Sequence, residues 1–110
     1  MVDALRAFLR GLGGPLVLWV VSKNPMHGYG IIKEIERLTG ERLKPATAYL
    51  LLNRLEENGF LASRLKRRGR RELKYYHLTD SGRTILAEIS AFFNLPIKRM
   101  IANLLGEDDL

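Results

Sequence analysis

Two stretches of the chain carry side chains that could bind a polyanion. Residues 63–74 (SRLKRRGRRELK) hold seven basic side chains and one acid. Guanidinium and ammonium groups donate charge-assisted hydrogen bonds to phosphates, and a cluster of them attracts a polyanion. Upstream, residues 44–54 (KPATAYLLLNR) combine a lysine and an arginine with threonine, tyrosine and asparagine. Side chains of these types can hydrogen-bond to the edges of nucleic-acid bases.

The positive charge is concentrated in the middle of the sequence. The 110 residues carry a net charge of +6. Residues 44–79 contain nine basic and three acidic side chains, residues 1–43 contain six and four, and residues 80–110 contain three and five. The middle segment therefore holds the whole excess, which favours a nucleic-acid partner. A solvated basic face with no partner is the alternative that charge alone leaves open.

Composition and motifs exclude several classes of protein. A hydrophobic content of 46% and a charged content of 27% are typical of a globular domain. The absence of cysteine excludes disulfides and suits a reducing compartment, so we expect a cytoplasmic protein. The apolar run from Pro15 to Val21 is much shorter than the roughly 20 residues of a membrane span, and we expect no membrane association.

An enzyme is not expected either. The sequence has no glycine-rich phosphate loop, no metal-ligand spacing and no Ser/His/Asp arrangement with a local signature. His27 stands without a companion ligand, so we interpret it as a structural hydrogen-bonding group. We therefore predict no catalytic residue, no metal and no cofactor.

Apolar periodicity predicts that helices position the two polar stretches. Helical spacing indicates segments over residues 2–11, 15–23 and 29–38, followed by a helix from Pro45 that ends at Gly59. The third segment should turn Ile31, Ile32, Ile35 and Leu38 inward, and the fourth should turn Ala48, Leu52 and Leu55 inward.

The period then changes, which predicts a hairpin and a final helix. Residues 60–79 are rich in β-prone side chains around Gly69, and alternation favours Tyr76 for the core. Thr79 should cap the last helix, with Asp80 in its first turn. Pro96 should kink or break that helix near Asn94–Leu95.

The order of these elements is that of a winged helix-turn-helix protein. We predict a mainly α fold with a small two-stranded β-hairpin. Residues 1–79 would form the winged helix-turn-helix domain with an N-terminal helix, and residues 80–110 a C-terminal dimerisation helix and tail. In such a fold a basic hairpin can reach phosphates while the preceding helix enters a major groove.

Three segments also resemble the PadR family of transcriptional regulators. His27, Gly28 and Tyr29 match the first segment, and a Pro-x-Thr-x-Tyr run begins the second at Pro45. The second closes with Leu-Glu-x-x-Gly at residues 55–59, and the third is Tyr-Tyr-x-Leu-Thr-x-x-Gly at residues 75–82. The resemblance covers residues 14–93. It implies a dimeric DNA-binding regulator, usually a repressor, whose C-terminal helix makes the dimer. The chain departs from the family pattern at Gly30, Lys44 and Leu50.

We expect the DNA contacts to come from the helix that begins at Pro45 and from the hairpin. The expected residues are Lys44, Thr47, Tyr49, Leu50, Asn53, Arg54, Arg67, Arg68, Arg70, Arg71 and Lys74. An alternative leaves Tyr49 and Leu50 packed on the flank of the domain. A second functional alternative is a winged-helix adaptor that binds RNA or protein partners without an operator of its own.

Large apolar residues near the C-terminus predict a homodimer, because a chain of this size cannot cover all of them. The expected interface residues are Phe8, Ile89, Phe92, Phe93, Ile97, Met100, Ile101 and Leu104. Trp19 either packs in the domain core or, with Phe8, Phe92, Phe93 and Met100, lines a pocket for a small hydrophobic effector at the dimer centre.

Overall fold

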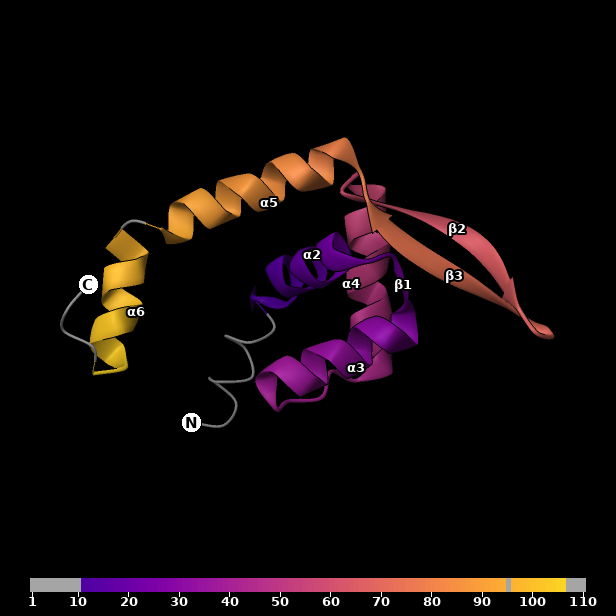
Figure 1. The fold of residues 1–110 in the computed structure, drawn as a ribbon, viewed down its shortest axis with the longest axis horizontal. Helices are drawn as coiled ribbons and strands as arrows, with labels where there is room; N and C mark the ends of the chain where they lie inside the picture. The colour runs from indigo at the N-terminus through magenta and orange to yellow at the C-terminus, as the bar shows by residue number, and fades with distance from the viewer. Residues whose placement is uncertain (1–10, 95, 107–110) are drawn as a thin grey trace.

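The computed structural model describes residues 11–94 and 96–106, and it has the predicted order of helices, hairpin and terminal helices (Figure 1). The predicted helix over residues 2–11 lies almost wholly outside the described residues. The elements are α2 (Gly13–Lys23), β1 (Met26–His27), α3 (Gly28–Thr39), α4 (Pro45–Glu57), β2 (Leu61–Arg68), β3 (Arg71–Leu78), α5 (Asp80–Phe93) and α6 (Pro96–Leu104). The prediction of a mainly α fold with a small β-hairpin is confirmed.

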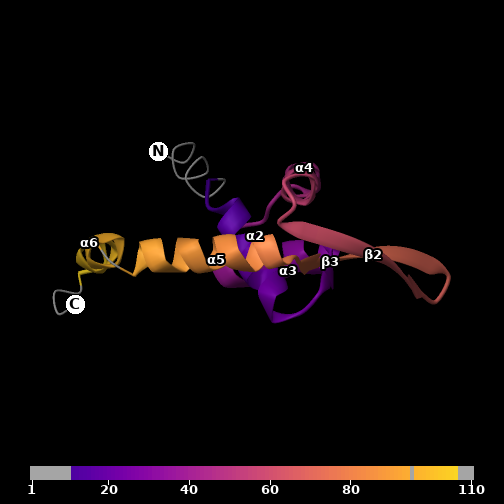
Figure 2. The same cartoon turned by 90° about the horizontal axis from the view of Figure 1, so that it is seen from above.

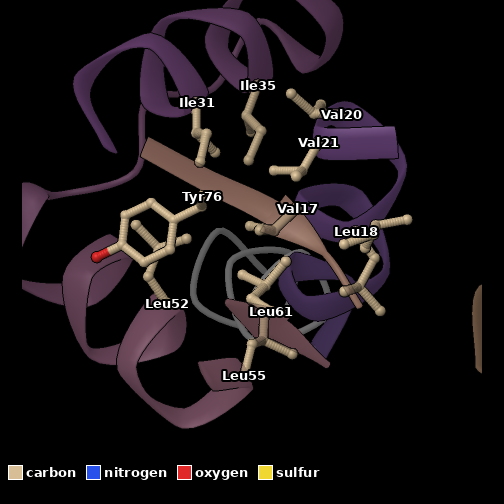
Figure 3. Close-up of a cluster of buried hydrophobic side chains, with 11 residues drawn as sticks. Val17, Leu18, Val20, Val21, Ile31, Ile35, Leu52, Leu55, Leu61 and Tyr76 are labelled. Carbon is tan, nitrogen blue, oxygen red and sulfur yellow. The ribbon is translucent and has the colours of Figure 1, made fainter. Parts of the chain in front are cut away.

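Helices α2, α3 and α4 and the base of the hairpin enclose one apolar core (Figure 3). Its most deeply buried large side chains include Val17, Ile31, Leu52 and Leu61. Tyr76 is 2% exposed and belongs to the same cluster, as alternation along β3 predicts. The core therefore joins α4 to the base of the hairpin. These are the two elements from which the sequence predicts DNA contacts, and both pack on the same core.

Helix α2 begins two residues earlier than the sequence indicates. Gly13 and Gly14 lie in its first turn, and do not break the chain before Pro15. A Cβ atom on the buried Gly13 would lie 2.9 Å from Leu51 Cδ2, so this glycine allows α2 to pack closely on α4.

The prediction of Trp19 in the domain core is wrong, because Trp19 is 42% exposed.

The sheet has three strands, where the sequence predicted two. Its order is β1-β3-β2, and both pairings are antiparallel. Strand β1 pairs Met26 with Tyr76 and His27 with Tyr75. Two residues are too few to show the alternation by which a strand is recognised in a sequence, which explains why β1 was missed.

Helix α3 is capped at both ends. The Nδ1 atom of His27 accepts a hydrogen bond from the Gly30 amide at 3.0 Å, so the structural interpretation of His27 is confirmed. At the other end Gly40 has φ of 73° and its amide donates to the carbonyl of Glu36, a left-handed C-cap. Leu38 was predicted inward and is 38% exposed, because the core cluster reaches only as far as Ile35.

Helices α5 and α6 form an arm that leaves the domain (Figures 1 and 2). Thr79 caps α5 by accepting a hydrogen bond from the Gly82 amide at 3.0 Å, as predicted. The first part of α5 packs on the core through Ile85, Leu86 and Ile89. The helix ends at Phe93 and α6 begins at Pro96, which confirms the predicted break.

Candidate nucleic-acid interface

The side of α4 opposite the core presents the residues that the sequence assigns to base reading. Leu50 is 52% exposed, and Asn53 and Arg54 are exposed as well. Thr47 is half-buried at the edge of this face. Lys44 precedes the helix and makes no side-chain cap hydrogen bond, so its exposed ammonium group can reach an external anion.

Tyr49 is both packed and exposed. Its side chain lies on the backbone of Gly28, where an added Cβ atom would sit 2.4 Å from Tyr49 Cε1. Tyr49 nevertheless stays 42% exposed. The flank-packing alternative is therefore met in part, and the contact with Gly28 connects α4 to the start of α3.

The hairpin projects beyond the domain, and its tip is basic (Figures 1 and 2). Arg68 is paired with Arg71 across the strands, and Gly69 and Arg70 form the two-residue loop. Gly69 has φ of 62°, a conformation that glycine adopts without strain at the first position of a tight hairpin turn. Like charges directly opposite each other on a sheet are destabilising, so Arg68 and Arg71 weaken the isolated hairpin.

The strand register divides the hairpin into two faces. One face, which we call the outer face, carries Arg64, Lys66 and Arg68 on β2. On β3 the same face carries Arg71, Leu73, Tyr75 and His77. The inner face carries Ser63, Leu65 and Arg67 with Glu72, Lys74 and Tyr76 opposite. The outer face has four basic groups and no acid. The inner face has an acid opposite Arg67.

Lys74 is engaged within the protein, although the sequence assigned it to DNA. Its Nζ atom lies 3.0 Å from Glu56 Oε1 and 5.4 Å from the centroid of the Tyr76 ring. The hydrogen bond to Glu56 raises the pKa of Lys74.

Lys66 was not among the predicted contacts. It lies exposed on the outer face, 5.4 Å from the Tyr75 ring centroid, a position that strand alternation could have identified.

In the described part of the chain the arginines of the tip form no ion pair. The other ion pairs in the described part of the chain are Glu34–Arg37, Glu36–Arg42 and Asp80–Arg83. Within residues 11–94 and 96–106, Lys74 is thus the only basic residue of the hairpin that has an ion-pair partner. The structure brings Arg67, Arg68, Arg70 and Arg71 together at one end of the molecule, all exposed.

Most of the predicted interface residues that the structure describes are exposed on the arm. Phe92 is 64% exposed and Leu104 is 77% exposed. Met100 and Ile101 are exposed too, Phe93 is half-buried edge-on against Phe92, and Ile89 packs partly on the core. Phe8 and the side chain of Ile97 lie outside what the structure describes.

Trp19 lines an open cleft of about 500 Å³ between α2, α5 and the end of β3. The cleft is also lined by Lys23, His77, Arg83 and Ser90, and Lys23 Nζ lies 4.9 Å from the centroid of the Trp19 ring. Phe93 and Met100 are not part of this cleft. The predicted effector pocket between two copies therefore stays a prediction.

Two structural features are absent from the described residues. None of their helices has the length and apolar character to cross a membrane. No group of three or more His, Cys, Asp or Glu side chains is placed to hold a metal ion in that part of the chain.

The chain is similar to regulators of known fold. It is 33% identical over 84 residues to the transcriptional regulator Rv3488 of Mycobacterium tuberculosis, covering 76% of this chain and 78% of that protein. A PadR family transcription regulator from Clostridium difficile superposes with a TM-score of 0.75 at 28% identity, covering 86% of this chain and 98% of the other. Bacillus subtilis PadR in complex with operator DNA gives a TM-score of 0.63 at 29% identity, covering 68% of this chain.

Some relatives are much longer than this chain. It spans 44% of the Bacillus subtilis PadR chain. It spans 20% of a protein from transposon TN4556 of Streptomyces fradiae, to which 64% of this chain is 39% identical. The model of the transcriptional regulator PadR-like family matches residues 17–88. That match includes α3, α4 and the hairpin and covers more than half of the sequence, so the chain belongs to the PadR-like family of transcriptional regulators and not to a family of enzymes.

Proposed function

We propose that the chain binds double-stranded DNA as a homodimer and represses transcription at the sites that it binds. The single observation that carries the proposal is the exposed hairpin tip, whose four arginines form no ion pair in the described part of the chain. A polyanion is the partner that relieves the repulsion between Arg68 and Arg71. The resemblance to Bacillus subtilis PadR, which was solved in complex with operator DNA, supports the same partner.

In this proposal the two basic elements have different tasks. Asn53 and Arg54, with Leu50, enter the major groove and read base edges, since a helix fits that groove. The tip arginines and Lys44 hold phosphates and thereby orient the helix without reading sequence. The arm formed by α5 and α6 joins two copies, so that two α4 helices face half-sites about 10 base pairs apart, or a multiple of that spacing.

Selection of bound duplexes from a random pool tests this function. The proposal predicts a two-fold symmetric site, because a symmetric dimer presents the same face of α4 twice. A pool that yields no enriched sequence, with affinity that hardly changes between low and moderate salt, would instead support the adaptor alternative. An RNA or protein partner should then bind without competition from duplex DNA.

A further inference from the structure

A carboxylate on α4 bonds to both strands of the hairpin. Glu56 lies in the last turn of α4 and is half-buried. Its Oε2 atom accepts a hydrogen bond from Ser63 Oγ on β2 at 2.5 Å, and its Oε1 atom accepts one from Lys74 Nζ on β3 at 3.0 Å. These bonds lower the pKa of Glu56, the Ser63 bond contributing more than the Lys74 bond. The side chain is therefore ionised at neutral pH and each of its oxygens is bonded to a different strand.

These contacts lie at the boundary between the packed base of the hairpin and its projecting part. One step toward the core on the same face, Leu61 and Leu78 are paired and buried. One step toward the tip, Leu65 is 67% exposed and its cross-strand partner is Lys74 itself. Beyond Glu56 no described side chain of another element bonds to the inner face, so the direction of the projecting part is set at this level.

On the outer face, Tyr75 contacts the neighbouring strand β1 at the same level. Tyr75 neighbours Lys74 in β3 and faces the other way. Its ring meets the His27 ring edge-on, with the centroids 5.4 Å apart, and His27 is itself fixed as the cap of α3. At this level β3 is therefore connected to the start of α3 through its sheet neighbour His27, and both strands are connected to α4 through Glu56.

We infer that Glu56 is a positioning residue that fixes the angle between α4 and the projecting hairpin. The effect of this angle on DNA binding rests on the function proposed above. Asn53 lies three residues before Glu56, about one helical turn, so the residue that reads a base and the carboxylate that holds the hairpin share one rigid segment. A fixed angle sets the distance between the base that α4 reads and the phosphates that the tip contacts. Selectivity for the correct duplex then depends on both contacts forming together.

Lys74 then has a different role from the one that its charge suggests. A lysine that held a phosphate would leave Glu56 on binding. A lysine that positions the hairpin keeps its bond to Glu56 in the complex. Lys74→Met then lowers selectivity without lowering the salt dependence of binding, whereas loss of a phosphate contact lowers the salt slope by about one unit.

The chain offers a matched control in Glu57. It is the next residue, it is exposed, and in the described part of the chain it has no side-chain hydrogen bond or ion pair. Glu56→Gln and Glu57→Gln remove the same charge from nearly the same place. Both variants therefore gain the same non-specific attraction to DNA, and only Glu56→Gln loosens the hairpin.

A distance measurement within the chain tests the positioning directly. The natural chain has no cysteine, so spin labels can be attached at Ala46→Cys on α4 and Arg70→Cys in the hairpin loop, both exposed positions. Labelled chain is diluted in unlabelled chain, so that only distances within one chain are seen. We expect the distance distribution to be wider in Glu56→Gln, and in Ser63→Ala, than in Glu57→Gln or the wild type. Equal widths in all four would overturn the inference.

Binding to a selected duplex and to a random duplex tests the consequence. We expect the ratio of the two affinities to fall about fivefold or more in Glu56→Gln and to stay within about twofold of the wild type in Glu57→Gln. Equal ratios in the two variants would contradict the positioning role, provided that urea unfolding shows both to be folded. If the wild type prefers no duplex, the proposed function fails, while the label distances still decide whether Glu56 positions the hairpin.

Discussion

The hairpin tip and the terminal arm both project from the core, but their exposed side chains are of opposite kinds. The tip exposes Arg68 and Arg71, placed directly opposite each other. The arm exposes Phe92 and Leu104, which are 64% and 77% accessible. Charge at the tip repels a second copy and attracts a polyanion, whereas apolar surface on the arm is stabilised by burial against another apolar surface. The two ends therefore suit the two partners proposed above, a polyanion at the tip and a second copy on the arm.

The largest effect is expected where the apolar surface is given charge. Phe92→Asp combined with Ile101→Asp should weaken self-association by about a hundredfold or more, because two unpaired carboxylates would be buried. Sedimentation at micromolar concentration measures this. Leu65→Asp is the control, since Leu65 is 67% exposed but lies on the hairpin, and it should leave association unchanged. A wild type that sediments as a monomer would remove the basis of the comparison.

The next largest effect should come at the junction between the two regions. A Cβ atom on Gly82 would lie 2.1 Å from the backbone oxygen of Phe60, so Gly82→Ala must displace α5 from the base of the hairpin. We expect a loss of about 2–4 kcal/mol in the free energy of unfolding, measured with urea. At Gly14 the added Cβ would meet no described atom within 4 Å apart from its chain neighbours and the nearby backbone of its own helix. There the same substitution should stabilise α2 by about 0.5–1 kcal/mol. Equal effects at both glycines would contradict the close contact.

Replacing a base-reading residue should lower the affinity for the selected duplex only. Asn53→Ala is expected to cost about 1–3 kcal/mol of binding free energy on the selected site, because an asparagine that pairs with a base edge loses both hydrogen bonds. Affinity for a random duplex should hardly change. Equal losses on both duplexes would assign Asn53 to phosphate contact, a role that we reserve for the tip.

A smaller effect is expected at the cap of the arm. Thr79 Oγ1 accepts a hydrogen bond from the Gly82 amide and donates one to the carbonyl of Gly59. Thr79→Ala should lower the free energy of unfolding by about 1 kcal/mol. The matched control is Thr84→Ala, because the exposed Thr84 hydroxyl bonds to the carbonyl of Asp80 within the helix and to no other described residue. It should change stability by less than about 0.5 kcal/mol. If Thr84→Ala costs as much as Thr79→Ala, the cap is not what stabilises the start of α5.

The smallest effect concerns pH. Hydrogen bonds from Ser63 and Lys74 hold the pKa of Glu56 below its ordinary value of 4.5. The stability that Glu56 contributes is therefore present above pH 4.5 and is lost as the pH falls through the lowered pKa. Urea unfolding of the wild type and Glu56→Gln should differ at pH 7 and converge in acid. A difference that persists unchanged in acid would mean that ionisation of Glu56 does not stabilise the hairpin.

The elements followed from the sequence because their signals are local. Apolar spacing located α3 and α4, and Pro96 marked the end of α5. Contacts between elements carried no such signal. Strand β1 has two residues and no visible alternation. The helix expected from residue 15 begins at Gly13, whose contact with Leu51 lies on another helix.

The candidate site was predicted in composition but not in internal pairing. Charge counting placed the tip arginines correctly on an exposed hairpin, yet it treated Lys74 as equivalent to them. The register with β2 and the proximity of Glu56 distinguish Lys74, and both depend on how α4 packs against the sheet. Trp19 was misplaced for a related reason, since an apolar helix does not reveal which of its sides a neighbour will cover.

The salt dependence of binding to a random duplex tests the central claim most directly. If the tip holds phosphates, Arg68→Ala with Arg70→Ala should flatten the slope of log K against log salt concentration by about two units, or about one for each lost contact. Lys98→Ala with Arg99→Ala removes the same charge from exposed positions on α6 and should leave the slope close to that of the wild type. A wild-type slope in the tip variant, or an equal fall in both variants, would contradict the account.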